Sequence, residues 1–141
     1  MVPNSSTTQE PTDAALRSRV EDLSLPPSEL SHRAHLRLAW TYLIEEEDFG
    51  VAAVRFRTTL RRYTTAVGAS AKYHETITWA YLALLRQAMD GRADRESNAL
   101  LAAHPELLDH EGGALSRVLD VPAATADPLA RRILVLPRRS P

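Results

Sequence analysis

The 141-residue chain contains no cysteine. Disulfide bonds, thiolate metal ligands and cysteine nucleophiles are therefore excluded. It also lacks the uninterrupted apolar run of about 18 residues that a membrane-spanning helix would need. The N-terminus is polar and does not have the pattern of a signal peptide. We therefore expect a cytoplasmic protein with no membrane partner.

Positive and negative charges are nearly balanced, and this balance argues against nucleic acid as a partner. Seventeen basic and eighteen acidic residues give a net charge of −1, and Lys72 is the single lysine. Proteins that bind nucleic acid usually carry a clearly basic face, so we expect no nucleic-acid partner. There is no glycine-rich phosphate loop and no GxSxG nucleophile motif. The sequence leaves the oligomeric state open.

Apolar residues recur at helical spacing over most of the chain. The spacing, the caps and the breaks predict helices over about residues 12–23, 29–47, 49–67, 71–89 and 93–103. Beyond Gly91 the pattern weakens, although Asp127 and Pro128 are a typical cap and first residue of a short helix. We expect an all-α fold, a helical bundle of about four to six helices with an irregular C-terminal third.

The chain is long enough for one domain with its own core. We expect a single helical domain over residues 13–136. Residues 1–12 are rich in Ser, Thr and Pro and are expected to form a disordered N-terminal tail. Residues 137–141 are expected to form a C-terminal tail.

Three of the five histidines lie on apolar faces of these predicted helices. A period of about 100° per residue places His32 and His74 near the centres of their buried faces, with His35 about 60° from His32. A buried polar group costs a few kcal/mol unless it is hydrogen-bonded, so each ring must find a partner or bind a metal. His104 and His110 fall beside a proline and a glycine and are expected in loops or at the surface.

The three buried histidines should meet at one end of the bundle. Short connections make neighbouring helices antiparallel, so the second and fourth helices run parallel and begin in the same end layer. We therefore expect His32, His35 and His74 to bind one transition metal ion, with Glu75 as a possible fourth ligand. Imidazole is a good ligand for Zn, Fe, Cu and Ni.

Three protein ligands would leave one coordination position open, as in catalytic rather than structural metal sites. The sequence thus predicts a small metal-dependent enzyme that acts on a small organic molecule, compatible with a specialised biosynthetic pathway. His74 and Glu75 are the candidate catalytic residues. The side chains expected to contact the substrate share these faces or lie at their edge: Trp40, Tyr42, Thr78 and Tyr81. The segment from about Asp127 to Arg139 is the candidate cover.

Two other classes of function remain open. A neutral histidine paired with Glu75 could perform metal-free acid–base chemistry in a lyase, isomerase or cyclase. Alternatively, the histidines could be core residues of a non-enzymatic binding module, or could sense metal or pH. The motif HxxH is weak by itself, and Thr78 breaks the HExxH zinc signature after His74.

These histidines lie in two sequence blocks, HRAHLRLAW beginning at His32 and KYHETITWA beginning at Lys72. The blocks resemble a family of small, uncharacterised bacterial helical proteins, over the second to the fourth predicted helices. The resemblance implies a helical fold and supports the pairing of the two blocks. It implies no particular activity, cofactor or substrate.

Overall fold

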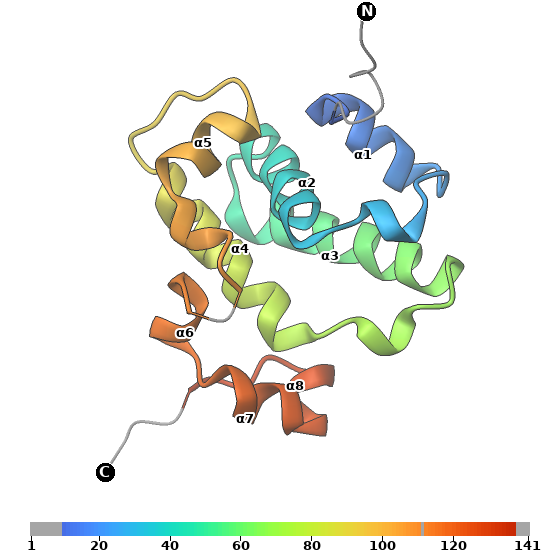
Figure 1. Cartoon of the computed structure of the whole chain (residues 1–141), viewed down its shortest axis with the longest axis vertical. Coiled ribbons are helices and arrows are strands. Elements are labelled where there is room, and N and C mark those ends of the chain that lie inside the picture. Colours follow the sequence, from blue (N-terminus) through green and yellow to red (C-terminus); the bar gives the residue numbers. More distant parts are fainter. Residues whose placement is uncertain (1–9, 111, 138–141) are drawn as a thin grey trace, which may run out of the picture.

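The computed structural model describes residues 10–110 and 112–137, and the helices within these ranges form one layered bundle with no strand (Figure 1). The predicted all-α fold is confirmed. The described residues contain eight α-helices: α1 (Asp13–Glu21), α2 (His32–Glu45), α3 (Phe49–Ala66), α4 (Glu75–Met89), α5 (Ser97–Ala103), α6 (Ala114–Val118), α7 (Val121–Ala126) and α8 (Pro128–Arg132). Single 3₁₀ turns precede α2, precede α4 and follow α5: η2 (Pro27–Glu29), η3 (Ser70–Lys72) and η4 (Pro105–Leu107).

The first three helices begin where the sequence offers a capping side chain. The side chains of Thr12, Ser31 and Asp48 each accept a hydrogen bond from a backbone N–H in the first turn of α1, α2 and α3. Such a cap satisfies one of the N–H groups that have no partner within the helix. The prediction that the second helix begins near Glu29 was wrong, because Ser31 is the cap and η2 forms a separate turn.

The fourth helix also begins later than its periodicity predicts. It starts at Glu75 rather than near Ala71, since His74 is its N-cap residue. The Nδ1 atom of His74 accepts a hydrogen bond of 3.2 Å from the backbone N–H of Ile77. His74 therefore lies in front of the helix, in an extended conformation, and not on the buried stripe along it.

Helix α2 is the centre of the bundle, and it packs against α1, α3, α4 and α5. Side chains on all of its sides are buried, including Arg37 and Thr41, which the helical period places on the outer face. Helices α1 and α5 pack against α2 and cover this face, which the helical period alone would leave in contact with water. The buried hydroxyl of Thr41 donates a hydrogen bond to the carbonyl of Leu38, in the same helix, at 2.7 Å.

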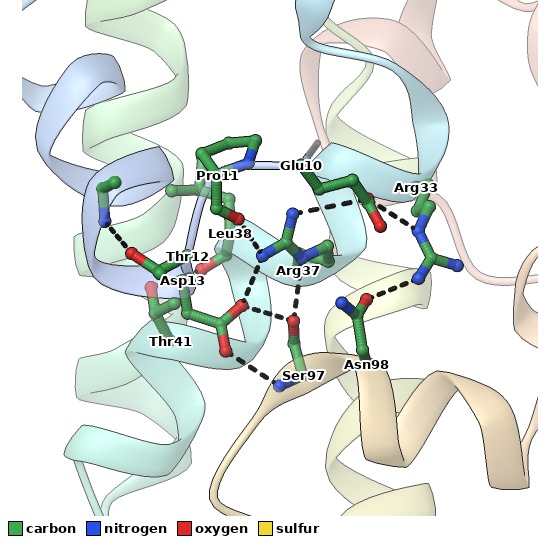
Figure 2. Close-up of polar contacts among 11 residues, drawn as sticks. Glu10, Pro11, Thr12, Asp13, Arg33, Arg37, Leu38, Thr41, Ser97 and Asn98 are labelled. Atoms are coloured by element: carbon green, nitrogen blue, oxygen red, sulfur yellow. Dashed lines mark hydrogen bonds and ion pairs between the residues drawn. The ribbon is translucent and has the colours of Figure 1, made fainter. Parts of the chain in front are cut away.

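A hydrogen-bonded cluster around the buried Arg37 guanidinium joins three helices (Figure 2). Nη2 donates to the Pro11 carbonyl at 2.7 Å and to Asp13 Oδ1 at 3.1 Å, and Nε donates to Ser97 Oγ at 3.0 Å. The backbone N–H of Ser97 donates in turn to Asp13 Oδ2 at 2.9 Å. The cluster thus ties the start of α1 and the start of α5 to the middle of α2.

The same cluster corrects the predicted limit of the N-terminal tail. Glu10 forms an ion pair of 2.9 Å with Arg33, and the carbonyl of Pro11 is bonded to Arg37. Residues 10–12 are therefore attached to the bundle. Residues 1–9 and 138–141, which include most of the two predicted tails, lie outside the described residues.

The last three short helices lie together at one side of α4, where α6 and α8 pack against α4 and α7 packs against α8 (Figure 1). The chain after α8 is attached to the first turn of α4 through Thr76, whose hydroxyl donates to the Ile133 carbonyl at 2.8 Å and accepts from Val135 N–H at 2.9 Å. Among the residues described, no helix has both the length and the apolar character needed to cross a membrane.

Replacing Asp13 with alanine tests whether the Arg37 cluster holds the bundle together. Asp13→Ala leaves the buried guanidinium without its nearest carboxylate, and removal of one partner of a buried pair costs about 3 kcal/mol. We expect a loss of this size in the free energy of unfolding, measured by urea denaturation. The control is Asp90→Ala, at an exposed carboxylate after α4, which should change it by less than about 0.5 kcal/mol. Equal losses in the two variants would contradict the role of the cluster.

Candidate functional site

A cavity of about 420 Å³ lies between α2, α3 and α4. This is within the range of about 300–1,000 Å³ that is usual for sites of small molecules. Exposed side chains such as Lys72 and His110 are part of its rim, so the cavity reaches the surface beside them. Its walls are mainly apolar and come from all three helices, as in Leu36, Ala39, Phe56, Leu60, Leu82 and Leu85.

Five of the predicted site residues line this one cavity: His32, His35, His74, Thr78 and Tyr81. Two others do not. Trp40 is buried in the core, where its Nε1 atom has no hydrogen-bond partner. Tyr42 points to another part of the core, and its hydroxyl donates to Glu21 at 2.5 Å.

The predicted cover is also absent from the cavity wall. No described residue after His110 lines the cavity. In the segment from Asp127, α8 packs instead against α4, and Arg131 donates to the carbonyl of Ala71 in η3 at 2.8 Å. The last two residues of the predicted cover, Arg138 and Arg139, lie outside the described residues.

The two histidines of α2 each use one ring nitrogen to bind a backbone carbonyl. His32 Nε2 lies 2.9 Å from the carbonyl oxygen of Leu107, and His35 Nδ1 lies 3.0 Å from that of Ser31. A carbonyl oxygen can only accept, so these nitrogens carry the hydrogen atoms. The other nitrogen of each neutral ring, His32 Nδ1 and His35 Nε2, carries a lone pair and is an acceptor.

Burial keeps both rings neutral over a wider range of pH. It lowers the pKa of His32 and of His35, and it does so although the carbonyls of Leu107 and Ser31 favour the protonated forms. Repulsion among neighbouring imidazoles acts in the same direction, from His110 on His32 and from both of these rings on His35.

His110 belongs to the site, although the sequence suggested a loop residue with no role. Its ring stacks on Tyr81 with centroids 5.8 Å apart and lies 5.1 Å from His32, and its Nδ1 atom lies 3.0 Å from the Tyr81 hydroxyl. The chain turns sharply after it, at Gly113, where a Cβ atom would lie 2.1 Å from the Glu106 carbonyl oxygen. His110 lies outside the apolar periodicity of the sequence. Gly112 and Gly113 are the signal in the sequence that indicates a turn after it.

His74 has no ring nitrogen left for a metal or a substrate. Nδ1 accepts from Ile77 N–H, which places the ring hydrogen on Nε2. Nε2 lies 2.9 Å from the carbonyl oxygen of Ala124 and therefore donates to it. The ring thus joins the start of α4 to α7, and its role in this arrangement is structural.

Glu75 is likewise occupied, and it does not line the cavity. Arg57 Nε lies 2.7 and 2.9 Å from its two oxygens, Trp79 Nε1 donates at 2.9 Å and the Tyr73 hydroxyl donates at 2.7 Å. Burial alone would raise the pKa of Glu75, but the hydrogen bonds from Tyr73, Trp79 and Arg57 outweigh it and lower that pKa. A carboxylate that is stabilised in this way is a poor general base.

The predicted metal centre is not supported by this geometry. Among residues 10–110 and 112–137, no three His, Asp or Glu side chains are placed so that they could hold one metal ion together. For His74 and Glu75 the physical reason is clear, since ligation would require their bonds to Ile77, Ala124 and Arg57 to break.

Comparisons with known proteins add no name to this site: no protein-family model matches the chain, and no curated protein or solved structure matches it. The resemblance of the blocks at His32 and Lys72 to a bacterial helical family stays a prediction. Function is therefore inferred from the cavity and its lining.

The lowered pKa values of His32 and His35 predict how stability depends on pH. Because the unfolded rings titrate near the ordinary value of 6.5, the unfolded chain binds protons more readily than the folded one. The stabilisation is present above this value and is lost as the pH falls below it, by at most about 1.4 kcal/mol per pH unit for each group. We expect the melting temperature to fall from about pH 7.5 to about pH 5.5.

The double variant His32→Leu, His35→Leu is the test of this assignment. It removes both titrating groups, so its melting temperature should depend less on pH in this range. Glu75 does not interfere, because its pKa lies below the ordinary value of 4.5 and the carboxylate stays charged. An unchanged pH dependence in the double variant would show that other groups cause it.

Proposed function

We propose that the protein binds a small, mainly apolar organic molecule in the cavity between α2, α3 and α4. The observation that carries this proposal is the size and lining of the cavity, about 420 Å³ enclosed mainly by aliphatic and aromatic side chains. The cavity opens to the surface beside Lys72 and His110, and its volume lies in the range that is usual for ligand sites.

The chemistry of the walls supports binding rather than metal-dependent catalysis. The two groups expected to do most of the chemistry, His74 and Glu75, use their polar atoms to hold α4 against α7 and α3. A His–Glu pair for acid–base catalysis has no support for the same reason. Of the three classes of function considered from the sequence, the non-enzymatic binding module is the one that this geometry favours.

The driving force for such a ligand is the removal of apolar surface from water. Each Å² of apolar surface that is buried contributes about 25 cal/mol. The rings of His32, Tyr81 and His110 form a more polar wall on one side, where ring centroids lie 4.9 to 5.8 Å apart. An apolar body with one polar group therefore fits the cavity best.

Filling the cavity is the direct test. We expect the neutral fluorescent dye prodan to bind the natural protein, and Ala39→Phe in α2 or Thr78→Phe in α4 to weaken that binding at least about tenfold. The melting temperature of Thr78→Phe should not fall, because this side chain is partly exposed and its new ring would enter the cavity. Fluorescence titration and thermal unfolding give the two measurements.

The control for these variants is Ala102→Phe, at an exposed position of α5. It adds the same ring outside the cavity and should leave the affinity for prodan unchanged. Prodan that binds both cavity variants as tightly as the control would place its site elsewhere and contradict the proposal.

Metal addition gives an independent prediction. Zinc or nickel added to metal-free protein should not raise the melting temperature, because a ligand stabilises only by binding the folded form and His74 and Glu75 are not available to it. Thermal unfolding with and without each metal, together with elemental analysis, checks this. Stoichiometric uptake that is lost in both His32→Leu and His35→Leu would restore the metal hypothesis.

A further inference from the structure

The wall of the cavity that α2 provides has hydrogen-bond acceptors without partners. His32 Nε2 and His35 Nδ1 donate to the carbonyls of Leu107 and Ser31, which leaves His32 Nδ1 and His35 Nε2 with lone pairs. Within the described part of the chain, neither of these two nitrogens has a hydrogen-bond partner.

These two acceptors are accessible rather than sealed in the core. Both side chains are partly exposed, and both line the cavity. The one buried side-chain nitrogen or oxygen without a partner among the described residues is Trp40 Nε1, so the free imidazole nitrogens are open to a ligand or to water. His32 and His35 lie one turn apart on α2, so both can face the same group.

We propose that the ligand of this cavity carries a hydroxyl group, which donates a hydrogen bond to His35 Nε2, with His32 Nδ1 as the alternative or second acceptor. This inference rests on the proposed function, because it concerns the polar end of the same ligand. The ligand class is thus an apolar alcohol or phenol.

The remaining lining argues against charged ligands. A carboxylate offers only acceptors, and these would meet the lone pairs of His32 and His35. Among the described residues no acidic side chain lines the cavity, so an ammonium group would find no counter-charge from them. It would instead meet Lys72, which lines the rim and has no ion pair among the described residues. A neutral hydroxyl group can donate to His32 or His35 without these unfavourable electrostatic contacts.

A set of ligands with one shared ring system tests this inference by displacement of prodan. Naphthol carries the donor, methoxynaphthalene lacks it, and naphthoate replaces it with an anion. We expect naphthol to bind at least about tenfold more tightly than methoxynaphthalene, because the ether leaves the acceptors of the wall unpaired. Naphthoate should bind more weakly than naphthol.

Variants at His35 assign the preference to its acceptor. In His35→Leu the preference for naphthol over its methyl ether should fall, and in the double variant His32→Leu, His35→Leu the two compounds should bind equally, because no imidazole acceptor of α2 then remains. His35→Gln returns an acceptor oxygen and should restore part of the preference. His104→Leu is the control, since His104 pairs with Glu106 at 3.0 Å outside the cavity and its loss should change nothing.

Each contrary result points to a different failure. If prodan binds but naphthol and its ether compete equally well, or if the preference survives in the double variant His32→Leu, His35→Leu, the hydroxyl inference is overturned while the binding cavity stands. If naphthoate binds most tightly and Lys72→Gln removes that preference, the ligand is an anion instead. If neither prodan nor any naphthalene binds, the proposed function fails as well.

Discussion

The buried guanidinium of Arg37 is the group on which the arrangement around α2 depends. Arg37 is only 3% exposed, and a charge in that position is tolerated because Pro11, Asp13 and Ser97 supply acceptors on several sides. These partners come from the starts of α1 and α5. Satisfying one charge therefore brings both helices onto α2, and α2 becomes the buried axis of the bundle.

With α2 held in this way, the start of α4 determines the shape of the cavity. His74 caps α4 and bonds to Ala124, while Glu75 is held by Arg57 on α3. These contacts fix the first turn of α4 between α3 and the C-terminal helices. They use the polar atoms of two residues that had looked catalytic, and they leave an open apolar space between α4 and the two histidines of α2.

The hydrogen-bonding groups around that space determine which kind of ligand it suits. The imidazoles of His32 and His35 direct one N–H group each to the backbone carbonyls of Leu107 and Ser31, which leaves one acceptor nitrogen on each ring, and both residues line the cavity. Burial lowers the pKa of both rings and keeps them in this neutral form. A wall of acceptors beside apolar surfaces is a specific arrangement, and neither the composition nor the helical period describes it.

Some of these features follow from the sequence alone. The all-α class and the helices α1 to α5 follow from apolar periodicity, and the starts of α1 and α3 follow from Thr12 and Asp48, because caps and period are local properties of the chain. The sequence also predicts that His32, His35 and His74 lie close together, and these three residues line one cavity.

What only the tertiary structure decided is the partner of each polar group. Local sequence does not reveal that Ala124 bonds to His74, that Arg57 neutralises Glu75, or that His110 stacks on Tyr81 across the cavity wall. Nor does it reveal that Arg37 is buried, because the helical period assumes that one face meets water. These pairings join residues far apart in the chain, and whether a side chain is a ligand, a base or a structural bond depends on which atoms the folded chain brings within hydrogen-bonding distance.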